Sequence, residues 1–139
     1  MLAQVGIAVV VAAIAGIAAL IITRTTRANE PTEPTDYEVP AWLDRNDFER
    51  PEAPWLVAVF SSSTCLSCAD AWDKAQHLAS DEVVVQDVEA IEHKDLHERY
   101  KIDAVPMIVV VDEDGATRAS FIGVPTAADL WAALAELRS

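Results

Sequence analysis

Short apolar runs alternate with amphipathic stretches from Pro54 to the end of the chain. The apolar runs are bounded by turn residues and are rich in Val, Ile and Leu, as buried strands are. We expect strands at Trp55–Ser61, Val83–Val88, Pro106–Val111 and Thr117–Ile122. We expect helices at Cys65–Ala79 and His93–Tyr100, and a last helix that starts at Thr126. This order predicts an α/β domain in which helices cover both faces of a central mixed sheet.

Turn and cap signals support these boundaries. The segment Asp112–Gly115 ends in an Asp-Gly pair, which suits a hairpin between two strands. Gly123 then interrupts the second strand of that hairpin. Thr126–Asp129 resembles a capping box and therefore predicts the start of a helix.

The first part of the chain is of another kind. Residues 2–22 contain no charged side chain and are long enough to cross a bilayer as a helix. A cleaved signal peptide would have a basic segment before a shorter apolar core. Here the first basic residues, Arg24 and Arg27, follow the apolar run. We therefore interpret residues 1–23 as an uncleaved transmembrane anchor.

The segment 24–40 is polar, acidic and rich in Pro, which predicts a semi-extended linker. The domain then spans residues 41–139. Its first residues, Ala41–Glu49, carry Trp42, Leu43 and Phe48 at roughly helical spacing, and we expect a short helix there.

Arg24 and Arg27 also predict the orientation, because an excess of Lys and Arg stays on the cytoplasmic side. We expect a single-pass protein of the cell membrane whose domain faces the cytoplasm. An extracytoplasmic domain remains an open alternative.

Acidic residues dominate the rest of the chain. All 23 Asp and Glu but only eight of the ten basic residues follow Ala28, which leaves that part with a formal charge of −15. Nucleic acid and anionic lipid surfaces are therefore poor partners.

The two cysteines of the chain, Cys65 and Cys68, follow the first expected strand and open the next helix. A C-x-x-C pair at such a junction is typical of disulfide exchange. Unpaired N–H groups and the positive end of the helix dipole favour a thiolate at Cys65.

A zinc site is the alternative for the same residues, because His93 and His97 share a helix face and would complete a Cys2His2 set. The interval from Cys68 to His93 is about twice the 12 to 15 residues usual in zinc fingers. We therefore expect no metal.

The chain resembles the thioredoxin family over residues 54–139. The resemblance rests on the strand that leads into Cys65-x-x-Cys68, the acidic end of the second strand at Asp87–Glu89, the segment Ile102–Pro106, the Asp-Gly hairpin and the helix after Gly123. It implies a thioredoxin-like fold in which Cys65 is the nucleophile and Cys68 the resolving cysteine. It also implies that Pro106 is the family's cis-proline, next to which the Val105 backbone receives an extended substrate segment. An ordinary trans proline at the start of a strand is the alternative.

The resemblance has departures. Thioredoxin has Trp before the first cysteine and Gly-Pro between the two, where this chain has Thr64 and Leu66-Ser67. We expect these three residues to tune the pair. Thioredoxin also has a buried Asp six residues before the first cysteine, where this chain has Val59, and a buried Lys near the position of Val85. Proton transfer at the resolving thiol must therefore differ.

The sequence thus predicts a membrane-tethered thiol–disulfide oxidoreductase without a cofactor other than the Cys65–Cys68 disulfide. Its expected partners are protein thiols and disulfides, an unidentified electron donor or acceptor, and the membrane. A non-catalytic docking or assembly module with a thioredoxin-like domain is the alternative function. The direction of electron flow cannot be derived from the two intervening residues.

Overall fold

The computed structural model describes residues 13–15, 17 and 37–139, and the chain divides into the units Met1–Asp36 and Tyr37–Ser139. Most of the expected anchor (residues 1–23) and of the expected linker (residues 24–40) lies outside the described residues. No helix within the described residues combines the length and the apolar character that crossing a membrane requires.

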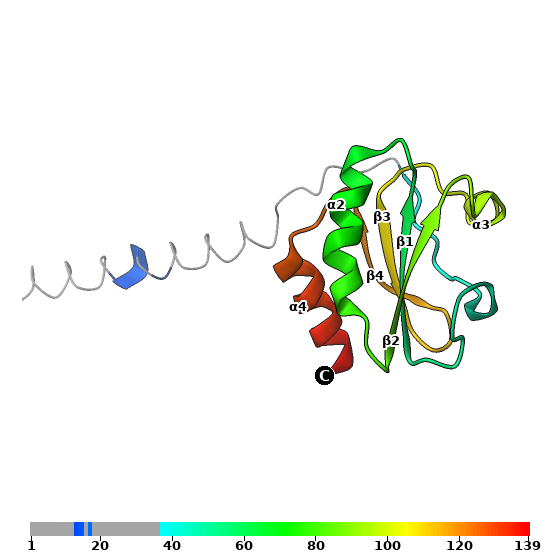
Figure 1. Ribbon diagram of the computed structural model, residues 1–139. Coiled ribbons are helices and arrows are strands. Elements are labelled where there is room, and N and C mark those ends of the chain that lie inside the picture. The colour runs from blue at the N-terminus through cyan, green and yellow to red at the C-terminus, as the bar shows by residue number, and fades with distance from the viewer. Residues whose placement is uncertain (1–12, 16, 18–36) are drawn as a thin grey trace, which may run out of the picture. The chain divides into compact units, whose positions relative to one another are not determined.

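The domain is built on a mixed sheet of four strands in the order β2-β1-β3-β4 (Figure 1). The strands are β1 (Trp55–Ser61), β2 (Val83–Glu89), β3 (Met107–Val111) and β4 (Thr117–Ile122). β1 pairs with β2 in parallel, whereas the pairs β1–β3 and β3–β4 are antiparallel. The mixed sheet expected from the order of elements is confirmed.

Helices cover both faces of this sheet, as expected. α2 (Leu66–Ala75), which continues into the 3-10 turn Gln76–Leu78, and α4 (Ala127–Arg138) lie on one face (Figure 1). α3 (Lys94–Arg99) lies on the other face. The period-two alternation along β1 divides its side chains between two cores. Val57 and Val59 pack with α2 and α4, whereas Ala58 and Phe60 pack with Leu96 of α3.

The expected helix at Ala41–Glu49 is wrong for most of its length, because only Arg45–Asp47 form a 3-10 turn. The preceding residues are extended beside the β3–β4 hairpin instead. The Leu43 N–H donates to the Gly115 carbonyl at 2.9 Å, and the Thr117 N–H donates to the Ala41 carbonyl at 3.0 Å. The hairpin thus satisfies backbone groups that a helix would have paired internally.

Candidate active site

Cys65 and Cys68 form a disulfide at the start of α2, with their Cα atoms 5.3 Å apart. Cys65 is the N-cap residue of α2, and its Sγ accepts a hydrogen bond from the Cys68 N–H at 3.2 Å. The loop after β1 holds this geometry, because the Cys65 N–H donates to the Ser62 carbonyl at 3.1 Å. A sulfur at the N-cap accepts a hydrogen bond from a free N–H and lies at the positive end of the helix dipole. When the pair is reduced, both effects favour the thiolate of Cys65.

The two sulfurs differ in access. Cys68 is 3% exposed, whereas Cys65 is partly exposed and the intervening Leu66 is 94% exposed. A partner protein can therefore approach Cys65 across Leu66 but cannot reach Cys68 directly. This arrangement fits the roles that the resemblance implies for the two cysteines.

The residues expected to tune the pair lie on the surface around it. The Ser67 hydroxyl lies 3.4 Å from the Cys65 Sγ, within hydrogen-bonding distance for sulfur. The Thr64 and Ser62 hydroxyls lie 3.1 Å apart. Ser67 therefore contacts the Cys65 sulfur, whereas Thr64 contacts the loop that precedes it.

Val105 and Pro106 lie directly before β3, and the peptide bond between them is cis. Pro106 is buried, and its carbonyl accepts the Gly123 N–H at 2.9 Å. Met107 pairs with Phe60 across the sheet. Pro106 therefore lies at the end of the sheet where β1 runs into the cysteine loop.

An open pocket of about 350 Å³ adjoins the disulfide. Its lining comes from the cysteine loop, the first turns of α2 and the end of β2. The residues are Ser61, Ser62, Ser63, Cys65, Cys68, Ala69, Trp72, Asp87 and Glu89. The pocket thus places two carboxylates and no basic side chain around the cysteine pair.

The two positions where thioredoxin has buried charges are apolar in the structure as well. Val59 is fully buried and Val85 is partly buried, both against α2 and α4. In the register of β1 and β2, Val59 is paired with Asp87. The carboxylate of this region therefore comes from the neighbouring strand.

Sequence reasoning assigned no role to Ser61, Asp87 or Glu89, although all three line the pocket. A signal was available. The alternation along β2 places Asp87 and Glu89 on the same face as Val85, near which the resemblance places the buried Lys of thioredoxin.

Glu89 has a structural role that the sequence does not reveal. Its carboxylate accepts the Ser63 N–H at 3.1 Å, the Ile91 N–H at 2.8 Å and the Glu92 N–H at 2.9 Å. These bonds, led by that from Glu92, lower the pKa of Glu89. Glu89 thus joins the cysteine loop to the turn that follows β2.

The two histidines considered for zinc do not form a group of metal ligands with the two cysteines. His93 precedes α3, and the His97 Nε2 lies 2.7 Å from the Val88 carbonyl oxygen. The His97 ring also meets Phe60 edge-on at 5.4 Å, on the face of the sheet opposite to α2. In the part of the chain that the structure describes, no group of three or more His, Cys, Asp or Glu side chains could hold a metal ion.

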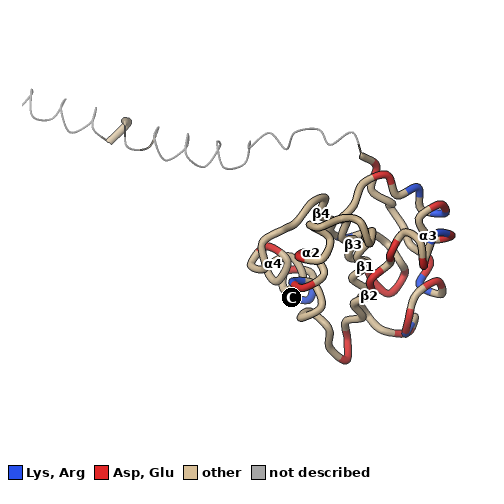
Figure 2. The backbone as a smooth tube through the Cα atoms, turned by 45° about the horizontal axis from the view of Figure 1, so that its top comes forward, with Lys and Arg blue, Asp and Glu red and all other residues tan. Residues whose placement is uncertain are grey.

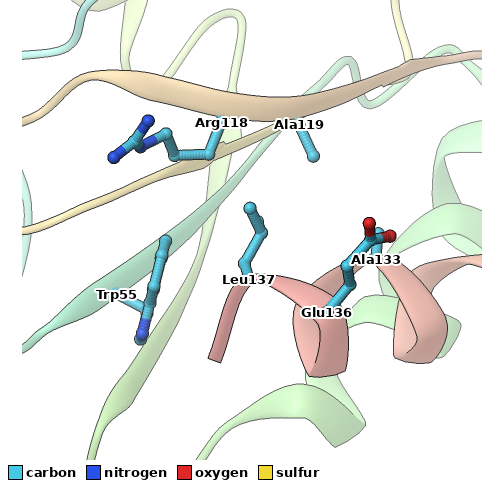
Figure 3. A pocket seen from close by; sticks show the side chains of 6 residues that line it. All are labelled: Trp55, Arg118, Ala119, Ala133, Glu136 and Leu137. Atoms are coloured by element: carbon cyan, nitrogen blue, oxygen red, sulfur yellow. The ribbon is translucent and has the colours of Figure 1, made fainter. Parts of the chain in front are cut away.

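A second pocket of about 450 Å³ lies between α4 and the ends of β1 and β4. Figure 3 shows its lining side chains, among them Trp55, Arg118 and Leu137. Trp55 begins β1, whereas Cys65 follows the end of that strand. This pocket is thus at the far end of β1 from the disulfide, and its lining contains no cysteine or histidine.

Comparisons with known proteins agree with this geometry. A family model described as a thioredoxin-like domain matches residues 44–138. No curated protein matches the sequence. Among solved structures, the chain is similar to the germline-specific thioredoxin Deadhead from Drosophila melanogaster, with 25% identity and a TM-score of 0.56. That alignment covers 66% of this chain and 89% of Deadhead.

Two further solved structures are similar to the chain in fold alone. One is thioredoxin-2, a component of the protein secretion machinery of the malaria parasite, with 17% identity, a TM-score of 0.53 and coverage of 60% of this chain and 82% of that protein. The other is a thioredoxin variant from Halobacterium salinarum, with 21% identity and a TM-score of 0.50. That alignment covers 58% of this chain and 71% of that protein.

Proposed function

We propose, from the premise that the chain belongs to the thioredoxin-like domain family, that it is a membrane-tethered thiol–disulfide oxidoreductase acting on protein thiols and disulfides. The observation that carries this proposal is the Cys65–Cys68 disulfide at the N-terminus of α2, with one sulfur accessible and the other buried. A domain that used its fold only for docking would not need this difference in access.

The reaction follows from that difference. In the reducing direction, the Cys65 thiolate attacks a partner disulfide and forms a mixed disulfide, which Cys68 then resolves. In the oxidised pair the Cys68 N–H donates to the Cys65 Sγ. The same hydrogen bond stabilises the Cys65 thiolate when the pair is reduced. Binding of an extended partner segment beside Val105 and Pro106 is part of the same proposal.

Residues 2–22 are proposed to hold the domain at the membrane, because this stretch carries no charge. Arg24 and Arg27 support a domain on the cytoplasmic side. The partners would then be proteins at or near that surface.

The first test is trapping of partners with the full-length chain. In Cys68→Ser, Cys65 remains able to attack but the mixed disulfide cannot be resolved. We expect covalent adducts with partner proteins that reductant releases. The double variant Cys65→Ser/Cys68→Ser is the matched control and should capture none.

Turnover is measured with the same chain in detergent, using insulin as the model disulfide substrate and dithiothreitol as the reductant. The wild type should accelerate insulin reduction, and Cys65→Ser should abolish this acceleration. Absence of turnover together with partner capture that survives Cys65→Ser would instead establish a docking module. The reduction potential of the pair then gives the direction of electron flow, since a value of about −270 mV favours a reductant and a value tens of millivolts higher favours an oxidant or isomerase.

A further inference from the structure

The resolving step needs an acceptor for the proton of the Cys68 thiol, because only the thiolate attacks a disulfide. Cys68 is 3% exposed and lines the pocket beside the disulfide, so its proton leaves most directly through that pocket. Val59 has no group that could take it. We propose that Asp87 accepts the proton of Cys68 and that Ser61 positions its carboxylate. The proposal rests on the proposed function, since it assigns a residue to that same reaction.

The register of the sheet brings Asp87 to the required place. Asp87 is the partner of Val59 on the neighbouring strand β2, and paired residues project from the same face of a sheet. Val59 and Val85 both pack against α2 and α4. By the alternation along β2, Asp87 therefore lies on the face that α2 covers, where Cys68 is buried.

A hydrogen bond and the pocket supply the second argument. The Ser61 hydroxyl donates to the Asp87 Oδ1 at 2.5 Å, which orients the carboxylate at the end of the sheet. Ser61, Asp87 and Cys68 all line the pocket of about 350 Å³ beside the disulfide. That space is large enough for a proton to pass through one water. The Asp87 side chain is also open to solvent, to which it can return the proton.

Other groups around the pocket do not compete for this role. Glu89 is the other carboxylate of the lining, and its two oxygens accept three backbone N–H groups. The residues of α2 that line the pocket, apart from Cys68, are Ala69 and Trp72, and β1 contributes Ser61. None of these three side chains titrates as a base near neutral pH.

The step balances as follows. The thiol proton of Cys68 passes to the Asp87 carboxylate, and the electron pair left on sulfur forms the Cys65–Cys68 bond. The bond between Cys65 and the partner sulfur breaks, and its electron pair leaves with the partner as a thiolate. The partner thiolate then takes a proton from Asp87 or from water, so the partner is reduced by two electrons and the cysteine pair is oxidised.

An aromatic disulfide reagent that releases a coloured thiolate separates the two steps in the reduced full-length chain. The first thiolate is released when Cys65 attacks the reagent, and the second when Cys68 resolves the mixed disulfide. In Asp87→Asn we expect the second phase to be about tenfold to hundredfold slower near neutral pH, with the first phase unchanged. The deficit should shrink toward pH 10, where water and hydroxide deprotonate more of Cys68.

The sign of the effect separates this role from simple repulsion between charges. A carboxylate that only repelled the Cys68 thiolate would disfavour it, so Asp87→Asn would accelerate the second phase. Acceleration, no change, or a deficit that is equal in both phases and at every pH would each overturn the proposal.

Matched variants complete the design. Asp81→Asn makes the same chemical change in the turn before β2, at the far end of that strand from Asp87, and should leave both phases unchanged. Asp87→Glu keeps a carboxylate and should restore most of the second phase. Ser61→Ala should slow the second phase less than Asp87→Asn, because only the orientation is lost. A normal second phase in Asp87→Asn together with intact insulin turnover refutes the role of Asp87 and leaves the proposed function standing. A wild type that shows both phases but no insulin turnover refutes the proposed function and leaves the role of Asp87 in the resolving step standing.

Discussion

The hydroxyl of Tyr100 joins the N-terminal segment of the domain to the end of α3. It donates to the Asp47 Oδ2 at 2.5 Å and accepts the Asp44 N–H at 2.9 Å. Burial, and then the hydrogen bond to Asp47, raise the pKa of Tyr100 to about 12. Burial alone would raise the pKa of Asp47, but the hydrogen bonds from Tyr100 and Arg99 lower it overall.

The substitution Tyr100→Phe removes both hydrogen bonds of the hydroxyl and keeps the aromatic ring. We expect the free energy of unfolding to fall by about 1–2 kcal/mol, because the Asp47 carboxylate loses a donor and the Asp44 N–H loses its acceptor. Urea denaturation of the full-length chain measures this change. Tyr37→Phe is the matched control, since Tyr37 is 50% exposed, and it should have almost no effect.

The wild type and Tyr100→Phe should also differ in how their stability depends on pH. A tyrosine in the unfolded chain ionises at about pH 10, and the pKa of Tyr100 in the folded protein is about 12. A raised pKa stabilises the fold below the unfolded value, and this contribution is lost as the pH rises through the folded value. The difference in stability between wild type and Tyr100→Phe should therefore shrink as the pH rises above 10. A constant difference would contradict the assignment.

At the scale of elements, the contact between residues 40–43 and the β3–β4 hairpin depends on one glycine. Gly115 has φ +83°, and a Cβ at this position would overlap the Leu43 carbonyl oxygen and lie 2.9 Å from the Trp42 Nε1. Gly123 has a similar φ of +87°, but a Cβ there would meet no atom. The two glycines thus share a backbone conformation and differ in the space available for a side chain.

We expect Gly115→Ala to lower the free energy of unfolding by about 3 kcal/mol or more, because strain in φ adds to the clash with Leu43. Gly123→Ala has only the strain in φ and should cost about 1 kcal/mol. Urea denaturation of both variants checks the difference. Equal losses would show that the N-terminal segment moves away from the hairpin without cost.

At the scale of the whole molecule, charge and the proposed anchor act together. Acidic positions occur on most elements and loops of the domain, and basic ones interleave with them around α3 (Figure 2). Such a domain is not attracted to anionic lipid, so the proposed attachment to a membrane would depend on residues 2–22. An extended linker over residues 24–40 would itself span about 50 Å.

We therefore expect the full-length chain to stay with the membrane pellet after alkaline carbonate extraction, and a variant without residues 2–22 to be released. Recovery of the full-length chain in the supernatant would refute the anchor. In intact cells, a membrane-impermeant thiol reagent should leave Cys65 unlabelled until the cells are permeabilised. Labelling from outside would refute the cytoplasmic orientation and leave the anchor standing.

Local patterns in the sequence were sufficient for the four strands and for the helices α2, α3 and α4. The apolar runs predicted β1 and β4 with the bounds that the structure has, and β3 to within one residue at its start. The position of Cys65 between a strand and a helix predicted its place at the N-terminus of α2. Such features depend on neighbours along the chain, which a periodicity or a cap signal records directly.

The pairing of distant segments was decided by the tertiary structure. Residues 41–49 have a spacing that suits a helix, yet the hairpin around Gly115 draws the segment 41–43 into an extended conformation. Asp87 could be placed on the same face of its strand as Val85 from the sequence alone. Its position beside Val59 and its bond to Ser61 depend on the register of two strands far apart in the chain. Sequence periodicity excludes a slip of one residue, which would turn every side chain to the other face, but packing and hydrogen bonding across the sheet decide among the remaining registers.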